Sequence, residues 1–331
     1  DHSDAAQQVL RHELETFVCD GQYQKGMETI LDTFLRNLGN GTEQPGMWIS
    51  GFYGSGKSHL AKMLRHLWTD FSFPGGATAR GLAKLPPQVS DALREATTAG
   101  KRYGGLHAAA GKLGAGAGDH VRLALLGIVF KSAGLPEAYA HARFVMWLRQ
   151  EGLLRAVEAD LEAAGRSLAE ELPHLYVSPR IAKALLKAYP GFAESETAAR
   201  ALLKAQFPQV ADISNDQLIA AITDALSMNG RFPLTLIVLD EVQQYIGSDT
   251  QKAYLVQEVT ETLCKHFRGQ LLFVGTGQSA LSGTANLQRL MARFPVPVML
   301  GDWDVENVTR KIILAKKPTA QPEVDRTWRA N

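Results

Sequence analysis

Apolar residues recur every three or four positions in several stretches of the chain, and each such stretch predicts an amphipathic helix. Two of them lie within residues 5–38 and join near Asp20 and Gly21. Similar patterns cover residues 88–99, 137–154 and 250–267. Residues 121–130 are apolar almost all round, which predicts a buried helix or, as the alternative, a strand.

Two further helices are predicted from their first residues. Pro179 directly after Ser178 suits the first position of a helix, where a backbone N–H has no helical partner. Ser214 and Gln217 have the spacing of a capping box, in which each side chain accepts the other residue's backbone N–H. The chain between about 119 and 229 is therefore predicted to be nearly all helical.

Short continuous apolar runs predict strands that are covered on both faces, as in a parallel sheet. They lie at residues 47–49, 234–239, 270–278 and 296–300, the third with polar residues at its C-terminal end, and a weaker run of small residues covers 103–111. Pro295 and Pro297 predict that the last run lies at an edge of the sheet or starts with a bend, because proline cannot donate to a sheet ladder. Strands that alternate with helices predict an α/β fold with a parallel central sheet.

The loop after the first strand carries the strongest chemical signal in the chain. It matches the phosphate-binding pattern G-x-x-x-x-G-K-[ST] between a strand and a helix, where backbone N–H groups and the helix dipole attract a phosphate. We expect Lys57 to reach the β- and γ-phosphates of ATP and the Ser58 hydroxyl to bind Mg²⁺. The nucleotide-binding candidates are Gly51, Phe52, Tyr53, Gly54, Ser55, Gly56, Lys57, Ser58 and His59.

A second signal follows the run at 234–239, which ends in two carboxylates. In the hydrolytic interpretation, Asp240 binds the magnesium ion through water and Glu241 polarises the water that attacks the γ-phosphate. The alternative is a pair of charges at the start of a helix. The phosphate loop upstream favours the hydrolytic interpretation.

Three further catalytic candidates follow. Thr276 and Gln278 end the next apolar run, where a side chain is able to contact the γ-phosphate or the water, and the sequence does not choose between them. Arg293 precedes the last strand, the position from which ring-forming ATPases reach a neighbour's γ-phosphate. A surface ion pair is the alternative for Arg293. For His59, local packing is favoured over contact with nucleotide.

The composition gives no evidence for a nucleic-acid partner, a disulfide framework or a membrane segment. The 331 residues contain 35 lysines and arginines against 34 aspartates and glutamates, so a net charge of +1 gives no argument for nucleic acid. The two cysteines, Cys19 and Cys264, predict neither a disulfide framework nor a zinc site. The sequence has no membrane-spanning run and no signal-peptide pattern, and we expect a cytoplasmic protein. Because the chain begins with Asp1, we expect it to be a piece of a longer protein.

Taken in order, these motifs resemble an AAA+ module, most of all the branch of origin-recognition and signal-transducing ATPases. The local sequence resembles the BrxC/PglY-type P-loop ATPases of bacteriophage-exclusion (BREX) systems in three places: Phe17-Val18, residues 48–60 and residues 289–300. The resemblance covers both ends of the chain well and its helical middle loosely. It implies an AAA+-like P-loop NTPase with a large helical insert between the Walker A and Walker B motifs and a truncated helical lid.

The resemblance also implies an organisation. Residues 1–45 form a leading helical segment, 46–73 the Walker A strand, loop and helix, and 74–230 a mainly helical insert with a second core strand near 102–113. Residues 231–301 carry Walker B, the sensor and the final strand, and 302–331 begin the lid, with a helix predicted at 305–316. A lid arginine that normally completes such a site stays unassigned.

The implied function is an ATPase of a phage-defence complex that couples nucleotide state to assembly or remodelling. ATP and Mg²⁺ are its expected cofactors, other BREX-type proteins its expected partners, and a homo-oligomer its expected nucleotide-bound state. DNA contact is expected only indirectly or through other regions, and no membrane contact is expected. Two alternatives stay open: a nucleotide-gated scaffold with little turnover, and an origin-recognition-like DNA-binding ATPase.

Overall fold

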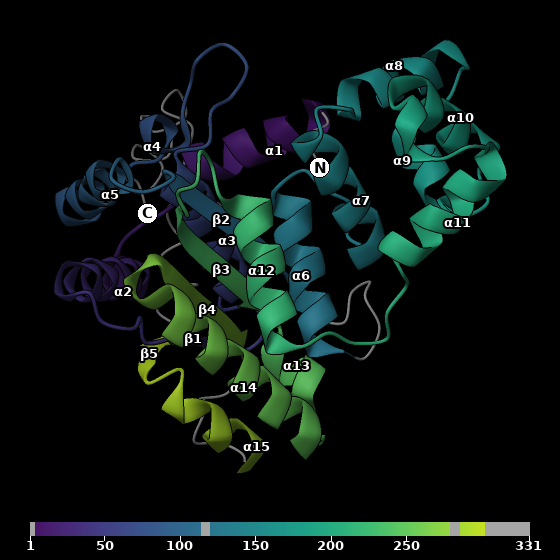
Figure 1. Ribbon diagram of the computed structural model, residues 1–331. Helices are drawn as coiled ribbons and strands as arrows, with labels where there is room; N and C mark the ends of the chain where they lie inside the picture. Colours follow the sequence, from purple (N-terminus) through teal and green to yellow (C-terminus); the bar gives the residue numbers. More distant parts are fainter. Residues whose placement is uncertain (1–3, 114–119, 279–284, 302–331) are drawn as a thin grey trace, which may run out of the picture.

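The protein is built on one sheet of five parallel strands, described here from a computed structural model that covers residues 4–113, 120–278 and 285–301. The strand order is β2-β3-β4-β1-β5 (Figure 1). The strands are β1 (Met47–Ser50), β2 (Leu106–Lys112), β3 (Leu234–Asp240), β4 (Leu271–Gly277) and β5 (Val296–Met299). The predicted α/β class with a parallel sheet is confirmed.

The pattern of apolar runs follows from helices on both faces of this sheet. In β1, Ile49 joins the core under one helical layer, whereas the neighbouring Trp48 joins the core under the other. Alternate residues of β3 divide in the same way, with Leu236 on the first side and Ile237 on the second. Because both faces are buried, the strands read as continuous apolar runs and not as alternating ones.

The first layer contains α1 (Asp4–Glu15), α2 (Gly21–Asn40), α3 (Lys57–Thr69), α4 (Ala79–Leu82) and α5 (Pro87–Gly100). The second contains α6 (Val121–Ser132), α12 (Asn215–Leu226), α13 (Val242–Ile246) and α14 (Thr250–Phe267). Both layers lie against the sheet in Figure 1. Residues 121–130 form a buried helix, so the strand alternative is wrong.

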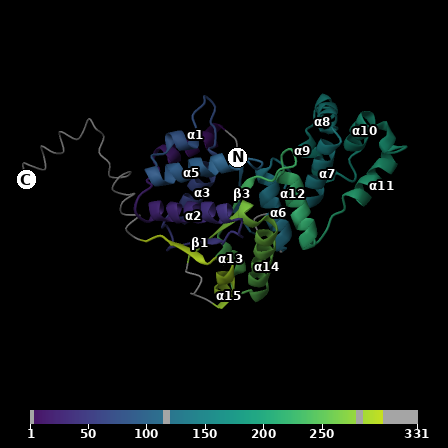
Figure 2. The same ribbon diagram turned by 60° about the vertical axis from the view of Figure 1, so that its left-hand side comes forward.

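The helices between α6 and α12 form a group set to one side of the sheet, which we call the helical lobe (Figure 2). It comprises α7 (Tyr139–Gln150), α8 (Leu154–Ala163), α9 (Leu168–Glu171), η1 (Leu172–His174), α10 (Pro179–Ala188), η2 (Pro190–Phe192) and α11 (Glu196–Gln206). The helical stretch predicted at about 119–229 thus consists of two parts, the helical lobe and the helices that flank it in sequence. Its outer helices, α6 and α12, belong to a sheet-covering layer, and β2 pairs with β3.

Several predicted element ends agree with the structure. Pro179 opens α10, where the Ser178 hydroxyl accepts the N–H of Ile181, and both hydrogen bonds of the Ser214–Gln217 capping box are present. The proline-rich β5 lies at an edge of the sheet, as expected. The remaining short elements are η3 (Arg268–Gln270), α15 (Ala285–Gln288) and η5 (Arg289–Ala292). The helix predicted at 305–316 lies outside the described residues, and no described helix has the length and hydropathy to cross a membrane.

Candidate functional site

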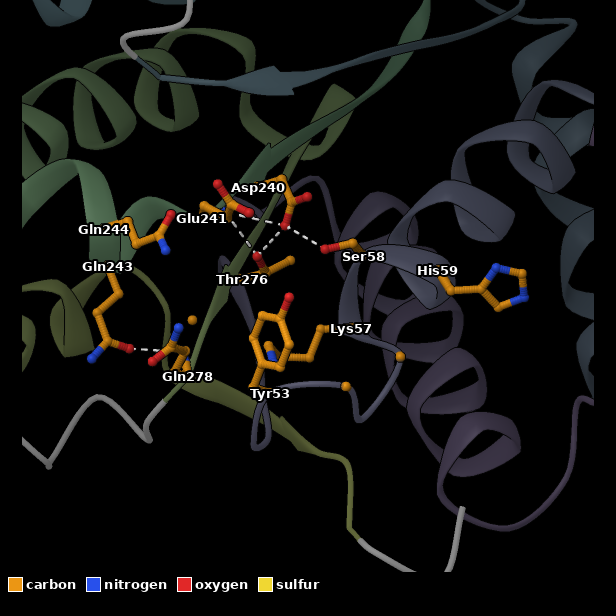
Figure 3. Close-up of a pocket in the computed structure, with 13 residues that line it drawn as sticks. Tyr53, Lys57, Ser58, His59, Asp240, Glu241, Gln243, Gln244, Thr276 and Gln278 are labelled. Carbon is orange, nitrogen blue, oxygen red and sulfur yellow. Dashed lines mark hydrogen bonds between the residues drawn. The ribbon is translucent and has the colours of Figure 1, made fainter. Parts of the chain in front are cut away.

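A cavity of about 440 Å³ opens where β1, β3 and β4 end. Parallel strands deliver their carboxyl ends to one edge of a sheet, which is where α/β proteins bind ligands. The cavity gathers most of the predicted site residues and adds Gly277 and two glutamines (Figure 3). Its lining is Tyr53, Gly54, Gly56, Lys57, Ser58, His59, Asp240, Glu241, Gln243, Gln244, Thr276, Gly277 and Gln278.

The loop between β1 and α3 has a backbone that requires glycine. Gly54 and Gly56 have φ values of 87° and 84°, in the left-handed region that side chains disfavour. A Cβ on Gly51 would lie 2.5 Å from Ser55 Oγ and 2.8 Å from the carbonyl oxygen of Leu300. The glycines of the motif therefore fix how the loop turns into α3.

Lys57, the first residue of α3, folds its side chain back into this loop. Its ammonium donates to the carbonyl oxygens of Gly51 and Phe52, at 2.8 Å each. Burial lowers the pKa of Lys57, and the nearby Asp240 carboxylate opposes that shift. The motif thus holds a cation at its centre, where a phosphate oxygen is a stronger partner than a neutral carbonyl.

The two motifs meet at Asp240. Its Oδ1 accepts a hydrogen bond from the Ser58 hydroxyl at 3.2 Å and another from the hydroxyl of Thr276. These residues come from α3, β3 and β4, and Ser58 and Asp240 are 182 positions apart in the chain. Three side-chain oxygens thus converge, and oxygen is the ligand type that a hard cation such as Mg²⁺ prefers.

Glu241 directly follows β3 in a strained conformation, with φ at 56° in the left-handed region. Its N–H donates to Thr276 Oγ1 at 2.9 Å and to Asp240 Oδ1 at 3.1 Å. Its carboxylate forms an ion pair with Lys112 at 2.8 Å. The hydrogen bonds therefore fix the backbone that carries this carboxylate.

The sequence analysis did not identify Lys112 as a site residue, although its position at the end of a strand could have been predicted. Lys112 is the last residue of β2 and pairs in register with Asp240, the last residue of β3. A hydrogen bond to Glu241 raises the pKa of Lys112 above its usual value. The carboxyl ends of two adjacent parallel strands meet, so the polar residue that ends the weak strand was the available signal.

Thr276 and Gln278, the two candidates for contact with the γ-phosphate or the water, have different surroundings. Thr276 is 1% exposed and bonded to Asp240, whereas the N–H of Gln278 donates to Gln243 Oε1 at 2.8 Å near the open rim. Gln243, on the short helix α13, was not predicted, and neither was Gln244. Both lie in the pocket because α13 begins directly after Glu241.

Of the other nucleotide-binding candidates, His59 packs against a neighbouring ring and Tyr53 is exposed. The ring of His59 points away from the carboxylates in Figure 3 and packs edge-on against Phe17, with 5.7 Å between ring centroids. Burial lowers the pKa of His59, while nearby Glu13 acts in the opposite direction. Tyr53 is 90% exposed at the pocket mouth.

Arg293 lies outside the cavity lining of its own chain. Its guanidinium forms ion pairs with Glu261 at 2.8 Å and with Glu43 at 3.5 Å, and its Nε is buried without a hydrogen-bond partner among the described residues. These contacts join α14, the loop before β1 and the segment before β5. The surface ion-pair interpretation describes these contacts, and a role toward a neighbouring subunit stays a prediction.

No protein-family model matches the chain, and no solved structure matches it. In the described ranges, no group of three or more histidine, cysteine, aspartate or glutamate side chains has the arrangement of a metal site. A magnesium ion that binds with a nucleotide does not require such a group, because it uses one or two carboxylates together with phosphate oxygens and water.

Proposed function

We propose that this protein binds MgATP and hydrolyses it, as an AAA+-like P-loop ATPase. One observation supports this most: the hydroxyl of Ser58 lies 3.2 Å from the carboxylate of Asp240. The two residues were assigned from separate motifs to the same magnesium ion, and the fold brings them into contact. The parallel sheet brings both strand ends to the same edge, and there these two side chains are in hydrogen-bonding contact, as two ligands of one ion would be.

The phosphates and the magnesium ion of the proposed ligand each have side chains or backbone groups that suit them. Lys57 and the backbone of Gly54 and Gly56 would receive the phosphates. The oxygens of Ser58, Asp240 and Thr276 are hard ligands that suit Mg²⁺ directly or through water. The magnesium ion supplies positive charge that offsets the charge developing on the phosphate oxygens.

The hydrolytic role belongs to Glu241. Its backbone is held by Asp240 and Thr276, so that its carboxylate stands at the end of β3 beside the cavity. There it would orient a water for in-line attack on the γ-phosphate and accept its proton. Lys57 would stabilise the oxygens of the transferred phosphoryl group.

The Lys112–Glu241 ion pair favours a second candidate, a nucleotide-gated scaffold with slow turnover. A carboxylate whose oxygen is paired with an ammonium at 2.8 Å is less free to orient a water for attack. The helical lobe provides a surface for protein partners. Steady-state turnover measured across protein concentrations separates the two candidates, because an enzyme that uses Arg293 of a neighbour speeds up as it assembles.

The biological setting we propose rests on sequence resemblance alone. It is a BREX-type phage-defence complex in the bacterial cytoplasm, in which this chain assembles with other defence proteins and with copies of itself when nucleotide is bound. Co-purification with BREX-type proteins, dependent on Lys57, is the test of this setting.

Replacing Lys57 by alanine tests the central proposal. Lys57→Ala should weaken ATP binding by at least about a hundredfold in titration calorimetry, since the cation at the centre of the loop is lost. The matched control is Lys131→Ala, on α6 and paired with Glu137, which should bind like the unaltered protein. Equal ATP affinity of Lys57→Ala and the unaltered chain would refute nucleotide binding at this loop.

A further inference from the structure

The phosphate loop is braced from outside by a tyrosine on α2. Tyr23 is 5% exposed, and its hydroxyl donates a hydrogen bond of 2.9 Å to the carbonyl oxygen of Ser55. Ser55 lies directly before Gly56 and Lys57, the end of the loop where a phosphate would be received. A group 32 positions upstream thus holds the backbone of the motif.

This bond determines which way one peptide group faces. The peptide bond between Ser55 and Gly56 is trans, so its C=O and N–H point in opposite directions. Since the Ser55 carbonyl points toward Tyr23, the N–H of Gly56 points away from α2. Gly56 lines the cavity, and its N–H meets no protein acceptor in the described part of the chain.

The space around Tyr23 is filled from both sides. A Cβ on Gly56 would lie 1.7 Å from the Tyr23 hydroxyl oxygen, so the tyrosine occupies the room that a side chain at position 56 would need. On its other side, the Tyr23 ring meets Phe17 edge-on, with 6.2 Å between centroids, and Phe17 in turn meets His59. The hydroxyl therefore has little freedom to leave Ser55.

We propose that Tyr23 is a positioning residue that aims the Gly56 N–H into the phosphate site by holding the Ser55 carbonyl away from it. The proposal rests on the proposed function of the loop as a phosphate site. Without the hydroxyl, the carbonyl either stays buried without a donor or turns toward the cavity, where it repels a phosphate. Tyr23 acts through the peptide and does not touch the ligand itself.

The same reasoning gives the leading helical segment a role. Glu13 of α1 forms an ion pair with Lys62 of α3, Phe17 packs on His59, and Tyr23 of α2 holds Ser55. All three contacts reach the loop or the first two turns of the helix that follows it. Movement of α1 and α2 would thus be transmitted to the Ser55–Gly56 peptide.

Replacing Tyr23 by phenylalanine removes the hydroxyl and keeps the ring. The probe is inorganic tripolyphosphate with Mg²⁺, which reports on the phosphate site without a nucleobase, and the measurement is titration calorimetry. We expect about tenfold weaker binding for Tyr23→Phe, the loss of one well-aimed donor to an anion. The matched control is Tyr176→Phe, which also loses a tyrosine hydroxyl bonded to a backbone carbonyl, that of Phe207 in the helical lobe.

A second readout reports on the peptide itself. In protein labelled with ¹⁵N-glycine, the Gly56 amide signal should shift when tripolyphosphate is added, and this shift should be much smaller in Tyr23→Phe than in Tyr176→Phe. A merely structural role for Tyr23 would alter melting temperature and leave this response intact. If Tyr23→Phe does not fold, Phe17→Leu keeps the hydroxyl but loosens the ring, and two- to threefold weaker binding is then expected.

The outcomes separate the two proposals. Normal binding by Tyr23→Phe, or equal weakening in both tyrosine variants, overturns the positioning role and leaves the phosphate site standing. Equal tripolyphosphate binding by the unaltered chain and by Lys57→Ala overturns the phosphate site and the role of Tyr23 with it. Weak binding by Tyr23→Phe alone, with the Gly56 response lost, supports the proposal.

Discussion

Two glutamates, one in the helical lobe and one at the sheet edge, have opposite surroundings. Glu171 of α9 is 6% exposed, and its carboxylate accepts from the Ser178 hydroxyl at 2.6 Å and from Arg180 at 3.2 Å. Glu241 is on a strained backbone at the cavity, and its carboxylate is paired with Lys112. The buried Glu171 carboxylate has its hydrogen-bond partners within the lobe, which indicates a structural role. Glu241, on its strained backbone, is held at the cavity, where a ligand would contact it.

Helix starts differ between the same two regions. In the lobe, the N–H groups at the starts of α9, α10 and α11 are capped by the serine side chains at 167, 178 and 195. The start of α3 has Gly56 and no side-chain cap. An uncapped start is not distinctive alone, because α7 and α8 also lack one. At α3 it coincides with the glycine turn and Lys57, and this combination leaves donors and a cation for an anion.

Replacing Glu241 should have the largest effect on catalysis. Glu241→Gln keeps the side chain's shape but removes its basicity, so ATP turnover should fall by about 10²- to 10³-fold while ATP still binds. Phosphate release measured at saturating ATP checks turnover, and calorimetry checks binding. Glu162→Gln, an exposed position on α8, is the control and should turn over normally. Retained turnover in Glu241→Gln would remove this residue from the hydrolytic role.

The next effect belongs to Glu171 and concerns stability. Glu171→Ala leaves the Ser178 hydroxyl and Arg180 without their acceptor, and the free energy of unfolding should fall by about 2–3 kcal/mol. Urea denaturation followed by circular dichroism measures it, against Glu162→Ala as the control. Binding of ATP by the folded variant should be unchanged. A variant as stable as the unaltered protein, or one that loses ATP binding while folded, would contradict the structural assignment.

Replacing Lys112, the ion-pair partner of Glu241, should have the smallest effect. Lys112→Met removes the ammonium but keeps the side chain's length, and turnover should rise about three- to fivefold, because a half-exposed ion pair contributes up to about 1 kcal/mol. The pKa of Lys112 is raised by its hydrogen bond to Glu241, so the lysine stays charged and the difference should be constant between about pH 6 and 9.

Added salt provides the internal check on this result. At about 0.5 M salt the ion pair is screened in the unaltered protein, and the two proteins should approach one another in turnover. Lys131→Met, which also loses an exposed ion pair, should match the unaltered protein throughout. Unchanged or slower turnover in Lys112→Met would show that the lysine does not restrain Glu241.

Local patterns predicted the elements well, because helices and strands of this fold bury complete stretches of apolar surface. The helix predicted at 250–267 has the bounds of α14, and the runs around Trp48 and Ile237 are strands. Local patterns did not predict which residues join the site through contacts with other elements. Lys112 ends a strand that its small residues predict only weakly, and Gln243 lies on α13, which no local pattern predicted.

The sequence specifies the glycine-rich loop around Lys57 and the acidic end of β3, because each is a local pattern of residue type and spacing. It also determined the alternation of helices and strands. The folded chain brings together residues that are distant in sequence: Ser58 meets Asp240, Lys112 reaches Glu241, and Tyr23 holds Ser55. These contacts depend on strand order and on helix packing across the sheet, and no local pattern specifies which distant strand ends become neighbours.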